Sequence, residues 1–132
     1  VLHLKTGCWD TPLSDKKHNC PVLLHQFGVL QNWISARTAA HEAFVIMGDF
    51  NRRMTVYDPF FLLLNKAAPL SLTTAGWASP CDNGTYFIDH ILLGGAARNW
   101  LQPQSLRVMT YKPETGTPTL SYHCAFSVRL AP

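Results

Sequence analysis

The sequence has few charged residues, which make up only 14% of its 132 positions. It has no apolar run close to the roughly 18 residues that a membrane-spanning helix needs. It also has no internal repeat, no low-complexity segment and no dense stripe of basic residues among aromatic ones. These absences argue against a disordered chain and a repeat array, and charge alone gives no support for nucleic-acid binding.

The composition is that of a folded domain. Hydrophobic residues make up 47% of the chain, and its length suits one domain at most. The formal net charge of +3 permits an anionic substrate without requiring a nucleic acid. The chain begins at Val1 rather than Met, carries no signal peptide, and reads from its first residues as the middle of a strand. We therefore expect a fragment, or a protein whose N-terminal part has been removed.

Four cysteines, Cys8, Cys20, Cys81 and Cys124, form an even set. An even count favours disulfides, which in turn favour a secreted or periplasmic location. Three pairings are compatible with the count. The pair Cys8–Cys20 is attractive because it would close the short loop between a strand and a helix, and it would leave Cys81–Cys124 as the second bridge.

The spacing of apolar residues predicts an alternating order of strands and helices. A helix starting near Pro21 has apolar residues every three or four positions from Leu23 to Ile34, and Asp58-Pro59 is typical of a helix cap and first residue. Strand, helix, strand, helix and several further strands indicate a mixed sheet with helices on its faces. The expected elements are strands in 1–9, 43–48, 70–74, 85–93, 106–111 and 120–130, helices from 19–21 to 37–42 and over 59–66, a loop at 77–84 and a turn at 112–116.

The most informative stretch is the apolar run of residues 43–48, which ends in Asp49 and Asn51. A run of this kind fits a strand buried on both faces. Because strand side chains alternate in direction, Asp49 and Asn51 are expected to point to the same side. Gly48 would let another group approach the backbone closely. Two oxygen-bearing groups facing one way suit a hard cation and its phosphate ligand, whereas the simpler interpretation is a polar turn.

Three more residues with reactive side chains lie on or beside expected strands. Asp89 shares a strand face with apolar neighbours, which is costly unless the carboxylate has a partner. His123, near the C-terminus, is a candidate imidazole for acid, base or electrostatic work on a phosphoryl group. His3 has the same capability, and a structural role is the alternative for each histidine. Side chains at strand ends are how layered α/β enzymes build their active sites.

The chain resembles the endonuclease/exonuclease/phosphatase family, whose motifs it carries in order over nearly its whole length. The resemblance implies a four-layer α/β sandwich of the DNase I-like type, with two packed mixed sheets between helices. Residues 1–132 would be the C-terminal part of a single such domain. The motifs are His3-Leu4-Lys5-Thr6-Gly7-Cys8, Gly48-Asp49-Phe50-Asn51, Ile88-Asp89-His90-Ile91 and Ser121-Tyr122-His123-Cys124.

The resemblance also implies a divalent-metal-dependent hydrolase of phosphate esters that uses Mg²⁺ or Mn²⁺. Asp49 would orient the attacking water and contact the metal, and Asn51 would hold the scissile phosphate. Asp89 would orient His123, and His123 would stabilise charge on the phosphoryl oxygens. His3 would be a second phosphate-contacting imidazole. The substrate would be a phosphate ester, with nucleic acid, phospholipid and inositol phosphate all open.

Two further positions follow from the same comparison. Arg52 could contact a phosphate as a bidentate donor, although a solvated turn explains it equally well. Tyr122 stands where the family has a metal-binding aspartate, and a phenol is a poor ligand for a hard cation. The family's N-terminal half, which supplies an asparagine and a glutamate, has no counterpart here. We therefore expect slow turnover, with Tyr122→Asp helping only when that half is present.

Two other functions remain open. A catalytically inactive relative could keep the fold and bind a phosphorylated ligand or a partner. A zinc site could use His3, Cys8, His18 and Cys20, although their spacing fits no common ligand pattern.

Overall fold

The structure is a computed structural model that describes residues 1–111 and 120–132, and it is a mixed α+β fold. Its main sheet has four strands in the order β1-β2-β4-β3, and β5 pairs with β6 in a second, two-stranded sheet. The elements are β1 (Leu2–His3), α1 (Cys20–Ala39), β2 (Phe44–Asp49), α2 (Pro59–Ala67), β3 (Leu70–Leu72), β4 (Asp89–Gly94), the 3₁₀ helix η1 (Gly95–Trp100), β5 (Arg107–Met109) and β6 (Ala125–Ser127).

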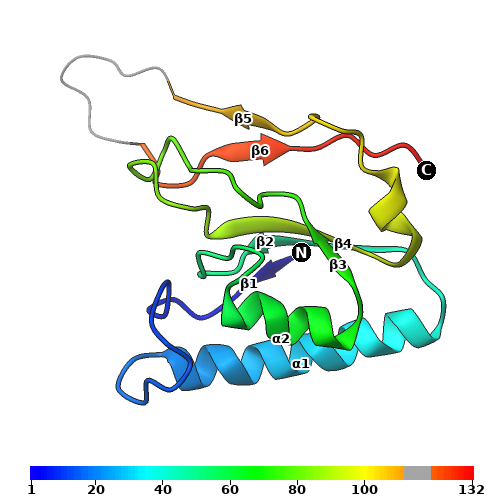
Figure 1. The fold of residues 1–132 in the computed structure, drawn as a ribbon. Helices are drawn as coiled ribbons and strands as arrows, with labels where there is room; N and C mark the ends of the chain where they lie inside the picture. The colour runs from blue at the N-terminus through cyan, green and yellow to red at the C-terminus, as the bar shows by residue number, and fades with distance from the viewer. Residues whose placement is uncertain (112–119) are drawn as a thin grey trace.

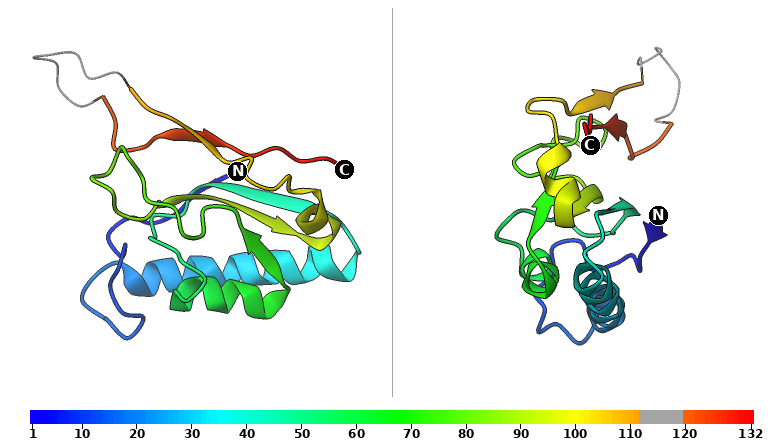
Figure 2. Two further views of the ribbon diagram at one scale, coloured as in Figure 1. Left: turned by 45° about the horizontal axis from the view of Figure 1, so that its top comes forward. Right: turned by 90° about the vertical axis from the view of Figure 1, so that its right-hand side faces the viewer.

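The elements are stacked in layers. Helices α1 and α2 lie side by side on one face of the main sheet, and the β5–β6 ribbon lies over the opposite face (Figure 1, Figure 2). The main sheet is mixed, because β1 runs parallel to β2 whereas β4 is antiparallel to both β2 and β3. The mixed sheet with two helices was predicted.

The helices form where the apolar spacing predicted them. Along α1, Leu23, Phe27 and Ile34 are buried, as expected for one face of an amphipathic helix. Helix α2 buries Phe60 in the same core, with its ring centroid 4.8 Å from that of Phe27. Pro21 and Pro59 both lie in the first turn of their helices, where a missing N–H has no cost.

Strand β2 differs from the prediction in one respect that matters for function. Its burial on both faces was expected, but only Phe44 and Ile46, on the helix side, are buried, and Met47 is 41% exposed. The physical reason is that the helices cover one face closely, whereas the narrow β5–β6 ribbon leaves part of the other face open. This open face of the sheet carries the site described below.

Several strands are shorter than predicted. The expected strand of 85–93 begins only at Asp89, opposite Asp49, the last residue of β2. The strands expected over 106–111 and 120–130 pair through only three residues each, and β1 has only two. A segment forms a strand only where a neighbouring backbone pairs with it in register. The apolar content of a sequence does not show where such pairing begins and ends. The predicted turn of 112–116 lies outside the described residues.

Gly48 allows the close approach of another backbone, as predicted. Its φ is +138°, and a Cβ added there would collide with the carbonyl oxygen of Leu2 in β1. Only glycine combines this backbone conformation with that contact. Gly48 thus lets β1 pair at the end of β2, which brings His3 beside Asp49.

Both expected disulfides are present. Cys8 pairs with Cys20, with their Cα atoms 5.0 Å apart, and Cys81 pairs with Cys124 at 5.6 Å. Two disulfides are compatible with an extracellular location. The alternative zinc site is wrong, because Cys8 and Cys20 bind each other and have no free thiolate for a metal.

We expect protein that is denatured without reductant to contain no free thiol, because all four cysteines are paired. A thiol-reactive dye in denaturant measures this, and the same sample after reduction is the control, which should show all four thiols. Two or more thiols per chain before reduction would contradict the pairing.

No helix in the described part of the chain is both long and apolar enough to span a membrane.

Candidate functional site

Two carboxylates meet on the open face of the sheet where β2 and β4 pair. Asp49, at the end of β2, is directly opposite Asp89, at the start of β4. His3 of β1 lies opposite Asp49 on its other side. Opposed residues of neighbouring strands have their side chains on the same face. The register thus places an imidazole and two carboxylates in one row across three strands.

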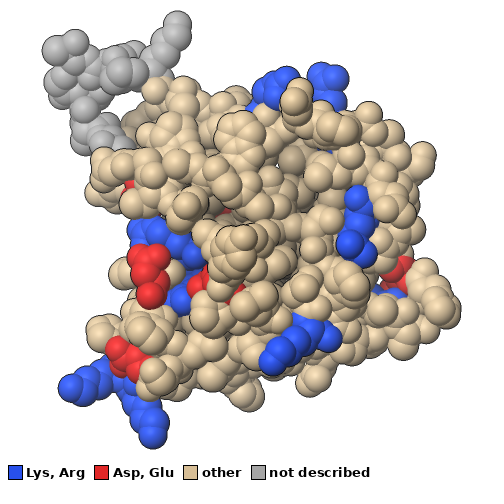
Figure 3. Space-filling view, in the orientation of Figure 1, with Lys and Arg blue, Asp and Glu red and all other residues tan. Residues whose placement is uncertain are grey.

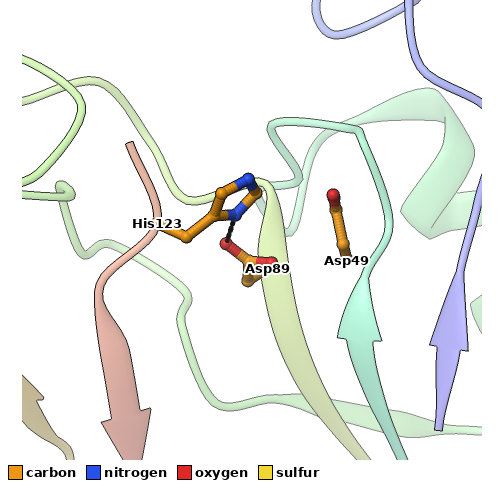
Figure 4. Close-up of side chains that lie close together, drawn as sticks. All are labelled: Asp49, Asp89 and His123. Carbon is orange, nitrogen blue, oxygen red and sulfur yellow. Dashed lines mark hydrogen bonds and ion pairs between the residues drawn. The ribbon is translucent and has the colours of Figure 1, made fainter. Parts of the chain in front are cut away.

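His123 joins this row from the segment that leads into β6. Its Nδ1 lies 2.6 Å from Asp89 Oδ2, and the ring stands over the Asp89 carboxylate (Figure 4). The predicted hydrogen bond between Asp89 and His123 is therefore present. Because Nδ1 donates to the carboxylate, the neutral ring keeps an unprotonated Nε2.

Asp49 has two partners of its own. Its Oδ1 accepts a 2.7 Å hydrogen bond from the backbone N–H of Asn51, and its Oδ2 lies 3.4 Å from His3 Nε2. Each of Asp49, Asp89 and His123 offers one potential metal-ligand atom, and these three atoms lie within 4.8 Å of one another. The predicted cluster of Asp49, Asp89 and His123 is thus brought together, with His3 at its edge.

A pocket of about 460 Å³ opens beside the cluster, between the open sheet face and the chain around β6. Apolar side chains form much of its wall, and Asp89 and His123 supply charged or titratable groups. An apolar pocket with a few convergent polar groups is the usual form of a ligand site. Its lining includes Met47, Asp89, Ile91, Ser121, His123 and Phe126.

The surroundings raise the pKa values of both members of the Asp89–His123 pair. Burial raises the pKa of the Asp89 carboxyl, and this outweighs the opposing attraction of His123. The hydrogen bond with Asp89 raises the pKa of His123 above its ordinary value, and the charges of Asp89, Asp49 and Asp82 act in the same direction. Both shifts favour a proton held between the two side chains.

We expect Asp89→Asn to lower the pKa of His123 toward the ordinary value of about 6.5, because the main cause of the shift is removed. A histidine with a raised folded pKa stabilises the fold fully below its unfolded pKa. That contribution is lost as pH rises through the folded value. A metal-free NMR titration of the His123 ring in both proteins tests this, and equal pKa values would contradict it.

Asn51 follows the end of β2 and is buried. It has a φ of +50°, its Nδ2 donates to the Leu4 carbonyl at 2.7 Å, and its Oδ1 accepts from Trp9 Nε1 at 3.3 Å. Strand β2 ends at Asp49, so strand alternation does not extend to Asn51, and the direction of its side chain is set by these two hydrogen bonds. Asn51 instead ties the end of β1 to the loop after β2.

Arg52 is buried, with a side-chain exposure of 3%. Its guanidinium donates to the Asp58 carboxylate, with a shortest distance of 2.7 Å, and to the carbonyls of Cys8 and Thr11. The same group lies 4.4 Å from the ring centroid of Phe60. Neither the solvated turn nor the exposed phosphate donor considered from sequence describes Arg52, because these contacts keep it in the interior.

Tyr122 does not join the cluster. Its side chain is 69% exposed, whereas its neighbours Ser121 and His123 line the pocket. The position that the family resemblance assigns to a metal-binding aspartate is thus filled by a solvent-facing phenol.

Sequence reasoning missed Arg53 and Asp82. Arg53 Nη1 lies 2.6 Å from Asp10 Oδ2, and Nη2 lies 3.1 Å from Asp82 Oδ2. These pairs join the loop after β1, the loop after β2 and the loop before β4. One signal in the sequence could have indicated that Asp82 lies near the site. Asp82 is next to Cys81, and the disulfide partner of Cys81 directly follows His123.

Basic side chains do not form one continuous patch on the face shown in Figure 3. Lysine and arginine groups are spread over that surface, and acidic groups lie beside several of them. This distribution agrees with the modest net charge and gives no electrostatic footprint of a nucleic-acid duplex on that face.

Comparisons of the chain with protein-family models, with curated proteins and with solved structures find no significant match. The assignment of function therefore depends on the geometry of Asp49, Asp89 and His123.

Proposed function

We propose that this chain carries the catalytic half of a divalent-metal-dependent phosphate-ester hydrolase, of the phosphodiesterase or nuclease type, in a DNase I-like fold. The observation that supports the proposal is the meeting of Asp49, Asp89 and His123 beside one pocket. Three distant parts of the chain supply these side chains, and the β2–β4 register places the two carboxylates face to face. The order of the four sequence motifs supports the same reaction class.

The donor set fits a divalent cation in part. Asp49 and Asp89 would hold the ion through carboxylate oxygens, which Mg²⁺ and Mn²⁺ both accept, and Mn²⁺ also tolerates an imidazole. The cation would supply positive charge to a phosphoryl oxygen and acidify a water. Two carboxylates are few for a hard cation. We therefore expect weak Mg²⁺ binding by this chain and stronger binding of Mn²⁺.

Each side chain of the cluster would have its own role toward the attacking water or the phosphate. Asp49 is placed to accept a hydrogen bond from the attacking water, since Asn51 and His3 fix the direction of its carboxylate. Asp89 holds the His123 ring, so that a protonated Nε2 would donate to a phosphoryl oxygen in the pocket. His3, whose side chain is 77% exposed, would contact the phosphate from the solvent side.

A second candidate function is phosphate binding without turnover. Three observations favour it: Tyr122 faces solvent, and the side chains of Asn51 and Arg52 both bond within the protein. Such a site would still bind a phosphate ester through His3 and His123, but it would lack groups to hold the metal firmly.

Metal binding and turnover distinguish these two functions. Mn²⁺ binding would be measured by calorimetry. Cleavage would be measured with bis(p-nitrophenyl) phosphate and plasmid DNA as substrates, each in the presence of Mn²⁺, Mg²⁺ or a chelator. We expect slow, Mn²⁺-dependent cleavage that the chelator and Asp49→Asn both abolish. For comparison we would also test Tyr122→Asp, and we expect little gain from it because the side chain at residue 122 is exposed to solvent.

Phosphate-ester binding with no cleavage above the chelator control would support the binding function instead. Fast cleavage with ordinary Mg²⁺ would show that Asp49, Asp89 and the two histidines suffice without further carboxylates. Mn²⁺ affinity unchanged in Asp49→Asn would remove this cluster as the metal site.

A further inference from the structure

We propose that the Cys81–Cys124 disulfide is the positioning element that holds His123 over Asp89, so that Cys81 and Cys124 are positioning residues of the site. Cys124 follows His123 directly in the chain and is buried, with an exposure of 3%. Its partner lies in the loop before β4, the strand that carries Asp89. The disulfide therefore joins the His123 segment covalently to the chain that leads to its carboxylate partner.

Apart from the packing of Phe126 in β6 on Phe87, with ring centroids 5.2 Å apart, little else restrains His123 in the described part of the chain. Residues 121–124 form no regular element, and β6 begins only at Ala125. Strand β6 pairs with β5 and is not part of the main sheet that carries Asp89. The backbone N–H of His123 donates only locally, to Ser121 Oγ at 3.0 Å. The ring hydrogen bond to Asp89 and the disulfide are thus the direct links between this segment and the site.

The loop that carries Cys81 is well suited to be an anchor. Ser79 N–H donates to the Thr85 carbonyl at 2.7 Å, and Gly84 N–H donates to the Ser79 carbonyl at 3.0 Å. Asp82 accepts from Thr85 Oγ1 at 2.8 Å and from Arg53 at 3.1 Å. The backbone of Arg53 in turn bonds to the loop after β1. The His123 imidazole is half exposed. Its position is fixed because the neighbouring Cys124 is linked by the disulfide to this internally hydrogen-bonded loop.

Without the bridge, the single hydrogen bond from Asp89 would have to order the segment alone. The net contribution of one hydrogen bond to a charged group is no larger than the conformational entropy cost of ordering a few residues. We therefore expect the His123 ring to leave Asp89 for much of the time, while the core remains folded. The catalytic consequence rests on the proposed function, whereas the change in the ring's position does not.

The test reads the tautomer of His123 directly, in metal-free protein labelled with ¹⁵N in its histidine rings. It is made at one alkaline pH, where the ring is neutral. In the native protein the ring nitrogen shifts should show a protonated Nδ1 and an unprotonated Nε2. In the Cys81→Ser/Cys124→Ser variant they should move to the averaged values of a free imidazole. The Cys8→Ser/Cys20→Ser variant is the matched control and should keep the native shifts.

His90 reports whether the core is intact in the same spectra. Its ring is fully buried, with Nε2 2.8 Å from the Arg52 carbonyl and Nδ1 2.6 Å from Thr74 Oγ1. Unchanged His90 shifts together with averaged His123 shifts would support the proposal. Native His123 shifts in the Cys81→Ser/Cys124→Ser variant would overturn it.

Mild reduction of the native protein provides a second reading if that variant does not fold. Cys8 and Cys20 are fully buried, whereas Cys81 is partly exposed, so a dithiol should open the Cys81–Cys124 bridge first. Release of His123 in the singly reduced protein would support the proposal, and a retained Nδ1–H would overturn it. In turnover assays, kcat should fall by up to about 100-fold with KM nearly unchanged, as for a misplaced catalytic group. Absence of turnover in every sample would count against the proposed function alone, because the ring shifts are read without substrate.

Discussion

Replacing Asp89 with Asn is expected to lower the Mn²⁺-dependent cleavage of a phosphodiester by roughly 100-fold or more. The substitution removes a carboxylate ligand beside Asp49, and it replaces the charged acceptor of the His123 ring with a neutral amide. An amide can accept a hydrogen bond but cannot balance the charge of an imidazolium. The measurement is kcat at saturating Mn²⁺, together with a thermal unfolding curve to show that the fold is retained.

The chain contains a matched control for this substitution. Asp15 and His18 form a third Asp–His pair, with Asp15 Oδ2 2.9 Å from His18 Nδ1, in the loop before α1. Asp15→Asn should leave kcat within about twofold of the native value, because this pair is exposed and outside the cluster. Equal losses in Asp15→Asn and Asp89→Asn would show that the effect is general and would count against Asp89 as a catalytic residue.

Replacing Asp58 with Asn is expected to lower the free energy of unfolding by about 3–5 kcal/mol, the range for breaking a buried ion pair by removing one partner. The Arg52 guanidinium and the Asp58 carboxylate are only 3% and 8% exposed, and their closest atoms lie 2.7 Å apart. Without the carboxylate, the guanidinium would keep its bonds to carbonyls but would carry an unpaired charge in the core. Urea denaturation of the two proteins measures the difference.

Asp10→Asn is the control for this second effect. Asp10 also pairs with an arginine, Arg53, but its side chain is 66% exposed. Its loss should change the free energy of unfolding by less than about 1 kcal/mol, the usual range for a surface pair. A comparable loss in both variants would mean that burial does not set the strength of the Arg52–Asp58 pair.

Asp58 also illustrates how a correct local prediction can miss a residue's main role. The dipeptide Asp58-Pro59 predicted the start of α2, and the helix begins there. The Asp58 side chain makes no cap hydrogen bond, because its carboxylate turns to Arg52 instead. Cap propensity follows from neighbours in sequence, whereas the partner Arg52 was recognisable only after the loop had folded back on the helix.

The residues of the candidate site also fall into two groups: those whose place in the site was predicted from the sequence, and those whose contacts only the structure shows. Asp49, Asp89 and His123 could be selected from the sequence, since each lies on or at the end of an expected strand and each belongs to a motif. The structure brings their ligand atoms within 4.8 Å of one another, and Asp89 and His123 are hydrogen-bonded and line the pocket. Asn51, Arg52 and Tyr122 were selected by the same motifs, yet the side chains of Asn51 and Arg52 bond within the protein and that of Tyr122 faces solvent. A motif specifies positions along the chain, but the direction of a loop side chain depends on what surrounds it.

The sequence by itself determined the α+β class, the two helices and the central strands, and it favoured the Cys8–Cys20 pair while leaving three disulfide pairings open. These follow from periodicity, helix-start signals and loop closure, which are local properties of the chain. Only the tertiary structure decided that one sheet face stays open, that Asp49 stands opposite Asp89, and that a disulfide anchors His123 there. Strand register and side-chain direction depend on contacts between residues far apart in sequence, and no local pattern encodes them.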